Sequence, residues 1–180
     1  QAERLVQRLQ EHLSGCSAIQ RLEFAGSYRR GRETVGDLDL LVASNDPNQV
    51  MDRLAEFPGL VDVIARGETK MSLRVDEQFQ IDLRVVQEQS FGAALQYFTG
   101  SKEHNVAIRG RARRMGFTIN EYGVARIESP EEYVGGRTEE ELYGLLDLQW
   151  IPPELREGRQ EIEWAEADGH PPELIQQTDI

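Results

Sequence analysis

Two carboxylates separated by one residue, Asp37 and Asp39, are the side chains best suited to chemistry in this 180-residue chain. They open an apolar stretch, 37–43, that we expect to be a strand, so both side chains share one face with Cα atoms roughly 6.6 Å apart. Two carboxylates converging on one point suit Mg²⁺, which prefers oxygen ligands from carboxylate, water and phosphate. In the alternative, a half-buried strand with solvated charges, the two acids would stack without a partner opposite Leu38 and Leu40.

A third carboxylate, Asp82, lies in the alternating stretch 80–86, on the same face as Arg84. Considered alone, Asp82 is more simply an exposed strand carboxylate. Considered beside Asp37 and Asp39, it supplies the third ligand that a site for two metal ions needs.

A turn rich in glycine and basic residues precedes the first two carboxylates. Gly26 and Ser27 follow the end of an apolar strand, the segment 29–32 includes Arg30, and Gly36 stands just before Asp37. Glycines allow main-chain N–H groups to approach a polyanion closely, and arginine can hold phosphate oxygens in a bidentate fork. Phosphate-binding groups beside metal-binding carboxylates indicate nucleotide chemistry.

The pattern of apolar residues predicts an α+β fold. The expected helices have apolar residues at helical spacing and cover residues 1–14, 47–57, 90–100, 101–116 and 131–143. The expected strands cover residues 19–25, 37–43, 60–66, 70–76, 79–86 and 117–124. We therefore expect a mixed or antiparallel sheet flanked by helices in residues 1–88, a small α/β subdomain in 89–156, and an acidic linker in 157–180.

The net charge of −12 belongs to the carboxyl-terminal part of the chain. Residues 1–126 hold 17 basic and 17 acidic side chains, whereas residues 127–180 hold 3 basic and 15 acidic ones. A neutral catalytic part does not favour loose DNA binding through bulk electrostatics. Binding to nucleic acid must therefore come from local arginines, from metals or from other segments.

Other features bound the class of protein. The sequence has no run of 18 apolar residues, and residues 1–4 lack the character of a signal peptide. The single cysteine, Cys16, excludes an intramolecular disulfide and fits a reducing cytoplasm. The three histidines His12, His104 and His170 follow no metal-ligand spacing. Because the first residue is not Met, we expect a piece of a longer protein.

These motifs together resemble the DNA polymerase beta superfamily of nucleotidyltransferases. The pair Gly26-Ser27 and the segment 36–39 carry the superfamily pattern, the segment 28–31 with Glu33 is similar to family X DNA polymerases, and 81–84 resembles the part that bears their third catalytic aspartate.

The resemblance implies a role for each of these groups in a nucleotidyltransferase palm over residues 1–88. Asp37, Asp39 and Asp82 would be the catalytic residues and would bind two Mg²⁺ ions, with Mn²⁺ as a substitute. The β and γ phosphates of a nucleotide would lie against the turn made by Gly26, Ser27, Arg30 and Gly36.

The region from 97 to 122 resembles the nucleotide-selecting thumb or fingers subdomain of the same family. Tyr97 and Phe98 would pack under the incoming sugar and base, the turn residues Gly100 and Ser101 would bind the nucleotide, and Asn105 would hydrogen-bond the minor-groove edge of the base. Lys102 stands where relatives often carry an acid, so no base contact is carried over to it.

Basic and aromatic residues further along this region are expected to bind DNA. Arg109 and Arg113 are four apart and share a helix face, although a basic helix is commonly only a solvated face. The resemblance implies that Arg109 touches the template strand and that Tyr122 contacts DNA as the subdomain closes. Arg84 would alternate between Asp39 and Glu121, which we treat as a gating hypothesis.

The resemblance implies a template-directed DNA polymerase that extends a primer 3′-hydroxyl with dNTPs, in DNA repair or gap filling, in a bacterial cytoplasm. The ending 150–157 is similar to bacterial family X enzymes, in which a phosphoesterase domain follows, and a helix-hairpin-helix region is expected before the palm. Two alternatives stay open. One is a template-independent nucleotidyltransferase acting on RNA, a small molecule or a protein, and the other is a non-catalytic DNA-binding module.

Overall fold

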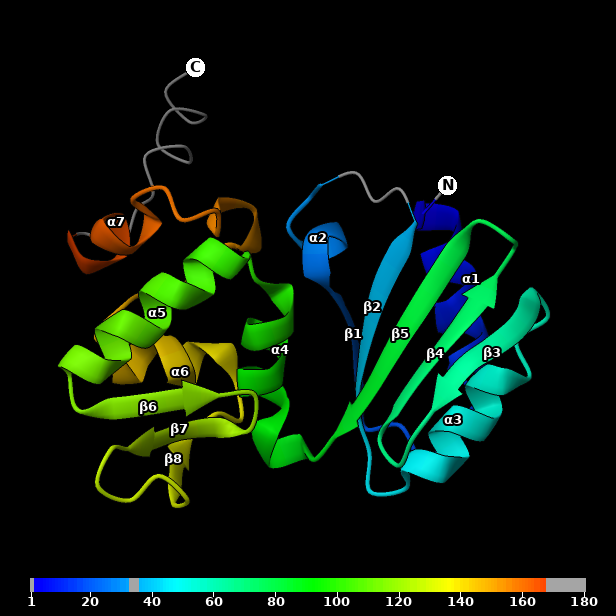
Figure 1. Cartoon of the computed structure of the whole chain (residues 1–180), viewed down its shortest axis with the longest axis horizontal. Coiled ribbons are helices and arrows are strands. Elements are labelled where there is room, and N and C mark those ends of the chain that lie inside the picture. The colour runs from blue at the N-terminus through cyan, green and yellow to red at the C-terminus, as the bar shows by residue number, and fades with distance from the viewer. Residues whose placement is uncertain (1, 33–35, 168–180) are drawn as a thin grey trace. The chain divides into compact units, whose positions relative to one another are not determined.

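The computed structural model describes residues 2–32 and 36–167, which form two compact units divided between Phe91 and Gly92. Figure 1 draws both units. Within these residues, no helix has the length and apolar character required to cross a membrane. Glu33, which contributed to the family resemblance, lies outside the described residues.

The first unit is built on a five-stranded mixed sheet in the order β1-β2-β5-β4-β3. Its strands are β1 (Arg21–Ala25), β2 (Asp37–Ala43), β3 (Leu60–Arg66), β4 (Lys70–Val75) and β5 (Phe79–Val86). All neighbours are antiparallel except β2 and β5, which run parallel at the centre of the sheet. The α+β class expected from the sequence is confirmed.

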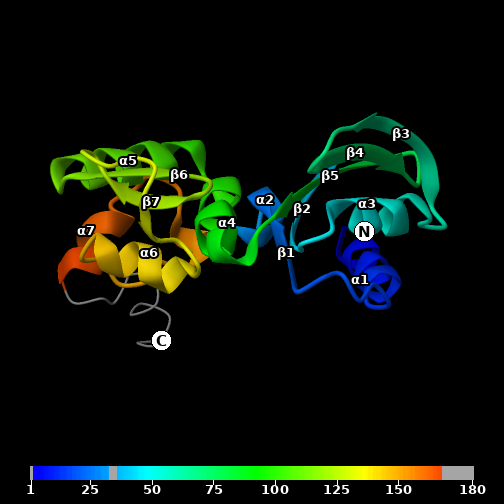
Figure 2. The same cartoon turned by 90° about the horizontal axis from the view of Figure 1, so that it is seen from below.

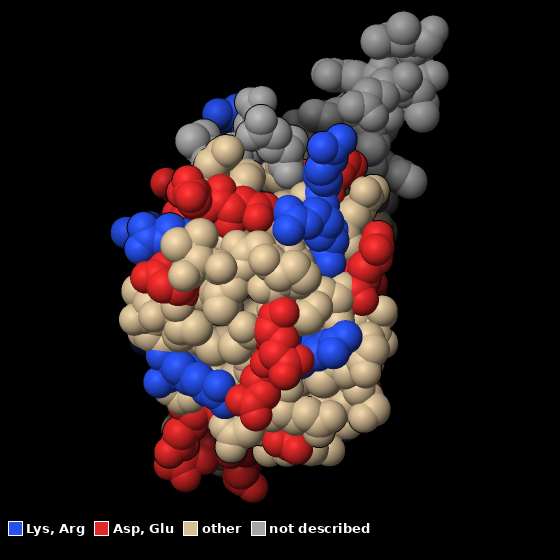
Figure 3. Space-filling view, turned by 90° about the vertical axis from the view of Figure 1, so that its right-hand side faces the viewer, with Lys and Arg blue, Asp and Glu red and all other residues tan. Residues whose placement is uncertain are grey.

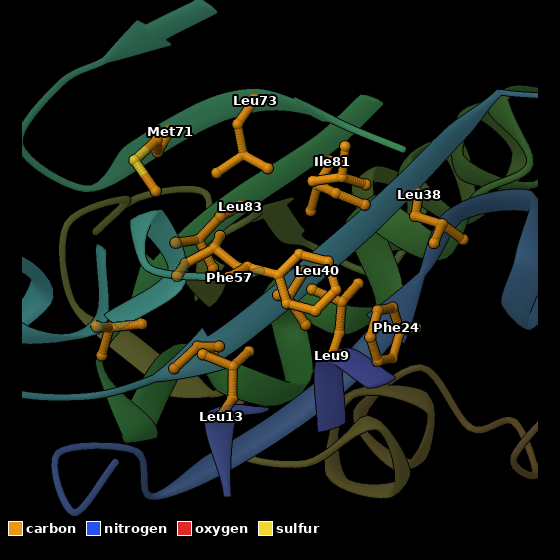
Figure 4. Packing of buried hydrophobic residues seen from close by; sticks show 14 of the residues in the cluster. Leu9, Leu13, Phe24, Leu38, Leu40, Phe57, Met71, Leu73, Ile81 and Leu83 are labelled. Atoms are coloured by element: carbon orange, nitrogen blue, oxygen red, sulfur yellow. The ribbon is translucent and has the colours of Figure 1, made fainter. Parts of the chain in front are cut away.

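Two helices, α1 (Ala2–Leu13) and α3 (Pro47–Ala55), cover one face of this sheet, as Figure 2 shows. Helix α3 begins at Pro47 because the Asp46 side chain accepts a hydrogen bond from the Gln49 amide at 3.2 Å. Leucines of α1 pack on apolar side chains that point down from β2 and β5 (Figure 4). Strand β5 alternates buried and half-buried residues along its length, and β2 alternates buried with more accessible residues over its first four positions, so Asp37, Asp39 and Asp82 lie on the face away from the helices.

The outer strand β3 is largely exposed, and every residue after Leu60 is accessible to solvent. Its neighbouring charges form surface pairs, Asp62 with Arg74 and Asp52 with Arg66. Figure 3 views the side of the molecule on which β3 lies and shows Lys and Arg interspersed with Asp and Glu. This face therefore has no large field of one sign.

The second unit combines helices with a three-stranded antiparallel sheet in the order β6-β7-β8. The short helix η1 (Glu88–Ser90) leads from β5 into α4. The elements that follow are α4 (Phe91–Thr99), α5 (Lys102–Arg114), β6 (Phe117–Asn120), β7 (Gly123–Arg126), β8 (Tyr133–Gly135), α6 (Glu139–Leu145), η2 (Pro153–Leu155) and α7 (Glu161–Ala167). Apolar side chains of α5, α6 and the sheet form its core, with Ile108, Leu142 and Tyr143 almost fully buried.

Three expectations about this unit differ from the structure. The single strand expected over 117–124 is wrong, because the Asn120 side chain accepts hydrogen bonds from the amides of Tyr122 and Gly123 and turns the chain between β6 and β7. The helix expected over 131–143 is wrong up to residue 138, where Thr138 caps the start of α6. Residues 161–167, expected within an acidic linker, form α7, and residues 168–180 lie outside the described part.

Candidate active site

The central parallel strand pair brings two of the predicted carboxylates together. In the register of β2 with β5, Asp39 lies directly opposite Asp82, and adjacent strands are about 4.8 Å apart. Their apolar neighbours Leu38 and Ile81 are almost fully buried in the core on the other face. Asp39 and Asp82 are half-buried, and Asp37 at the start of β2 is exposed. The carboxylates therefore line the face that the helices leave open.

The charges of these side chains act on one another. Burial raises the pKa of Asp39 above its ordinary value, and repulsion from Asp82 raises it further. The positive charge of Arg84 lowers the pKa of Asp39, whereas Asp37 makes a smaller raising contribution. Asp39 is thus the central member, with both other carboxylates and Arg84 near enough to influence its ionisation.

Two polar side chains orient Asp82. The Ser72 hydroxyl donates a hydrogen bond of 2.7 Å to Oδ1 of Asp82, and the side-chain nitrogen Nε2 of Gln80 donates one of 3.0 Å to the same oxygen. Ser72 can do so because the register of β4 with β5 sets it opposite Asp82. Sequence reasoning missed both residues. Counting back through the 76–78 turn would have identified Ser72 as the cross-strand neighbour.

The glycine turn lies against the central carboxylate. Gly26 follows Ala25, the residue opposite Asp39 in the pairing of β1 with β2, and it begins the short helix α2 (Gly26–Arg29). Its φ is +66°, and a Cβ placed there would overlap Asp39 Oδ2 and lie 3.2 Å from Asp39 Cγ. Only glycine can bring the chain this close to the carboxylate without strain.

The other residues predicted to bind phosphate belong to the same end of the sheet. The backbone amide of Arg30 donates a hydrogen bond to the Gly26 carbonyl at 3.3 Å. The Ser27 carbonyl accepts one from the backbone amide of Arg32 at 2.9 Å. The Gly36 carbonyl accepts from the Gln80 amide at 2.7 Å, which ties the start of β2 to β5. Helix α2 lies beside the start of β2 in Figure 1, so the turn is next to the strand that carries Asp37 and Asp39.

The donor set fits a hard divalent cation, because it consists of carboxylate oxygens with the central Asp39 made unfavourably charged by its neighbours. Over residues 2–32 and 36–167, however, no three His, Cys, Asp or Glu side chains form a group that is arranged to hold a metal ion. Asp82 instead keeps its hydrogen bonds to Ser72 and Gln80. The carboxylates are adjacent but not closed around a common point.

In the second unit, the junction of α4 and α5 gathers most of the residues predicted to bind the nucleotide. Tyr97 and Phe98 end α4 with their rings edge to face, 4.9 Å between centroids. Gly100 and Ser101 make the turn, and the Ser101 hydroxyl caps α5 by accepting from the His104 amide at 3.2 Å.

Asn105 is held tightly at this junction. Its side-chain nitrogen donates to the Tyr97 carbonyl at 2.8 Å, and its oxygen accepts from the Gln96 side chain at 2.8 Å. Gln96 is only 2% exposed and was not identified from the sequence. It fixes which way the Asn105 amide faces, so the start of α5 presents this side chain in one orientation.

The arginines of α5 lie in two different environments. Arg109 and Arg113 are exposed and lie four residues apart on the helix. Arg111 points elsewhere, donating to the Leu146 carbonyl at 2.7 Å and pairing with Glu166 of α7. Arg111 is therefore structural, and only the other arginines of this helix remain exposed.

The remaining predicted residues lie in the turn between β6 and β7. Tyr122 is 55% exposed there, next to the half-buried Glu121. Arg84 belongs to the first unit and Glu121 to the second, so their alternation stays a prediction.

Comparisons with known proteins match both units. Residues 1–119 match the family described as DNA polymerase beta palm, and residues 94–157 match DNA polymerase beta thumb. The chain is 42% identical over 162 residues to the DNA polymerase/3′-5′ exonuclease PolX of Bacillus subtilis (strain 168), covering 89% of this chain and 28% of that protein. It is 28% identical over 159 residues to DNA polymerase lambda of Rattus norvegicus, covering 73% of this chain and 28% of that protein. The chain spans less than a third of the length of both relatives.

Proposed function

This chain belongs to the DNA polymerase beta family, as its motifs suggested, and on that premise we propose that it is a template-directed DNA polymerase that extends a primer 3′-hydroxyl with dNTPs. One observation carries the proposal. Asp39 lies opposite Asp82 across the parallel pair of β2 and β5, beside Asp37 and against the Gly26 turn. Two relatives that are named DNA polymerases support it.

The three carboxylates would hold divalent cations, Mg²⁺ or Mn²⁺, between the primer end and the triphosphate. When bound there, two such ions would lower the pKa of the 3′-hydroxyl and offset the charge that develops on the phosphates. Because Ser72 and Gln80 both hold Oδ1 of Asp82, Asp82 would offer Oδ2 to a cation while these two hydrogen bonds keep its carboxylate oriented. Burial and the charge of Asp82 raise the pKa of Asp39, and a bound cation would offset this unfavourable environment for the ionised carboxylate.

The turn beside the carboxylates would position the nucleotide. Ser27, Arg30 and the Gly36 backbone would hold the β and γ phosphates, so that the α phosphate faces the primer oxygen. The 3′-oxygen forms a bond to that phosphorus while the bond to the leaving pyrophosphate breaks. Holding the two reactants in line is the main contribution that protein side chains make to this reaction.

The second unit would select the nucleotide and contact DNA. Tyr97 and Phe98 would support the sugar and base, and Asn105, with its amide held by Gln96, would read the minor-groove edge of the new pair. The exposed Arg109 and its helix neighbour Arg113 would bind the template strand.

The exposed Tyr122 would contact the same DNA, and Arg84 would release Asp39 when it pairs with Glu121. A role in repair or gap filling and a cytoplasmic location complete the proposal. The helix-hairpin-helix and phosphoesterase partners remain predictions.

Primer extension with Asp82→Ala tests this function. Asp82 is half-buried and its loss leaves the sheet pairing intact, so we expect a folded protein with no detectable incorporation. Asp62→Ala is the matched control, because Asp62 is also a strand carboxylate with a hydrogen-bonded partner, Arg74, but lies on the exposed outer strand. Normal incorporation by Asp82→Ala would exclude Asp82 from catalysis.

Two further measurements separate the alternatives. Extension that is equal with and without a template strand would indicate a template-independent nucleotidyltransferase. A non-catalytic DNA-binding module predicts that titration with Mg²⁺ or Mn²⁺ leaves nucleoside triphosphate binding unchanged, whereas the polymerase requires binding that depends on the metal.

A further inference from the structure

A buried polar chain connects α5 to the carboxyl-terminal side of the second unit. His104, fully buried in α5, contacts Glu161 Oε2 through Nδ1 at 2.6 Å and the Tyr143 hydroxyl through Nε2 at 2.9 Å. Burial lowers the pKa of His104 more than the hydrogen bond to Glu161 raises it, so the ring is neutral. A carboxylate only accepts, so Nδ1 donates to Glu161 and Nε2 accepts from Tyr143.

Glu161 uses both of its carboxylate oxygens in hydrogen bonds, although it directly follows the exposed residues 158–160. It is 2% exposed, and it also accepts hydrogen bonds from the amides of Gly158 at 3.0 Å and Arg159 at 2.6 Å. Burial pushes the pKa of Glu161 up, but the hydrogen bonds from His104 and the backbone outweigh burial and leave the pKa below its ordinary value. Glu161 is therefore ionised, and its carboxylate holds the backbone of residues 158–159 through two hydrogen bonds.

A second anchor holds the same segment a few residues earlier. Arg156 is fully buried and makes two hydrogen bonds to Glu139, of 2.8 and 3.1 Å, and its guanidinium lies over the Tyr143 ring. The carbonyl of Arg156 accepts from the Ser101 amide at 3.0 Å. The segment thus reaches the start of α5 at two points, the Ser101 backbone and the His104 ring.

The two contacted residues at the start of α5, Ser101 and His104, lie next to Asn105, which is proposed to select the nucleotide. His104 precedes Asn105 on α5, and the Asn105 amide donates to the Ser101 carbonyl at 2.9 Å. Glu161 lies beyond residue 157, where the match to the thumb family ends. Its contacts with α5 are therefore not among the features that placed this chain in its family.

We propose that residues 156–161 form a clamp on the first turn of α5, with Glu161 as a positioning residue that acts on nucleotide selection through His104 and Asn105. The proposal rests on the proposed polymerase function for its kinetic consequence, but its structural consequence does not. When the Glu161 contact to His104 is weakened, the first turn of α5 opens more often, and Asn105 loses its fixed orientation toward the nucleotide.

The test is Glu161→Gln in the whole 180-residue chain, which keeps the side-chain shape but places an amide against two backbone donors and the His104 ring. We expect the KM for dNTP to rise about tenfold while kcat stays within about twofold, because a lost charged hydrogen bond of this kind has that effect. We expect the backbone amides of His104 and Asn105 to exchange with deuterium about tenfold faster, in proportion to opening of the turn. Glu163→Gln is the matched control, since Glu163 lies exposed on the same helix.

If Glu161→Gln matches Glu163→Gln in both KM and amide exchange, or only lowers the melting temperature while α5 exchange stays unchanged, the clamp does not exist. If the wild-type chain extends no primer, the polymerase proposal fails, and amide exchange alone decides on the clamp. A ¹⁵N spectrum of the wild-type protein that shows His104 protonated at Nε2 and bare at Nδ1 would also overturn it, even if the variant does not fold.

Discussion

Substituting Gly26 by alanine tests whether the approach of the turn to Asp39 matters for activity. Gly26 has φ +66°, a conformation that costs an alanine about 1–2 kcal/mol. The added methyl group would also overlap Asp39 Oδ2. Since that oxygen is the end of a short rotatable side chain, the carboxylate would move and the backbone would stay.

The two effects have separate magnitudes. The backbone term predicts a loss of about 1–2 kcal/mol in the free energy of unfolding, and so a fall in melting temperature of roughly 2–8 °C. Relieving the overlap requires Asp39 Oδ2 to move by about 1 Å, and a displacement of that size at a reacting site lowers kcat by about 100-fold. Activity should therefore fall far more than stability.

Single-nucleotide primer extension under saturating dNTP, with thermal unfolding measured on the same samples, separates these terms. Gly116→Ala is the matched control, because Gly116 has φ +90° but nothing lies within 4 Å of a Cβ placed there. It should lose a similar amount of stability and keep its kcat. If Gly26→Ala loses stability but keeps kcat within about threefold of wild type, activity does not depend on the position of Asp39 against Gly26.

Two further predictions concern the carboxylates. Asp39→Asn should abolish incorporation yet raise the melting temperature at pH 7, because burial and Asp82 raise the pKa of Asp39 above its ordinary 3.8 and make its ionised form unfavourable in the folded chain. The gain should shrink as the pH falls from the raised pKa of folded Asp39 toward 3.8, and it should be absent below 3.8, where the folded and unfolded chains both hold the proton; a gain that is constant with pH would contradict this origin. Ser72→Ala should lower kcat about tenfold by releasing Asp82 Oδ1, with little loss of stability, because partners that orient a metal ligand typically contribute this much. An unchanged kcat for Ser72→Ala would show that Asp82 does not need this orientation.

Some parts of the site follow from local chemistry and could be predicted without a fold. Asp37 and Asp39 share a face because side chains alternate along any strand. The turn at Gly26 and the cap at Ser101 follow from residue types with strong local preferences. Where local signals conflict, prediction failed. Residues 131–138 are acidic enough to look helical, but Gly135 and Gly136 disfavour a helix there, and Thr138 caps α6 only afterwards.

Contacts between segments that are distant in the sequence could not be predicted from local residue types. Glu161 looks like part of a solvated acidic tail, and only its burial against His104, 57 positions away along the chain, shows otherwise. Gln96 and Ser72 are likewise ordinary polar residues until their partners are known. A hydrogen bond of this kind depends on two positions whose separation in sequence carries no periodic signal.

The sequence by itself determined the five strands and the two long helices of the first unit, the character of its turn and the presence of three acids on strands, because each depends on neighbours a few residues away. The tertiary structure decided that β5 pairs with β2 in parallel, after β3 and β4 have intervened, and so that Asp82 faces Asp39. Strand order and register are set by which buried faces pack together, and that choice is made by the whole core at once.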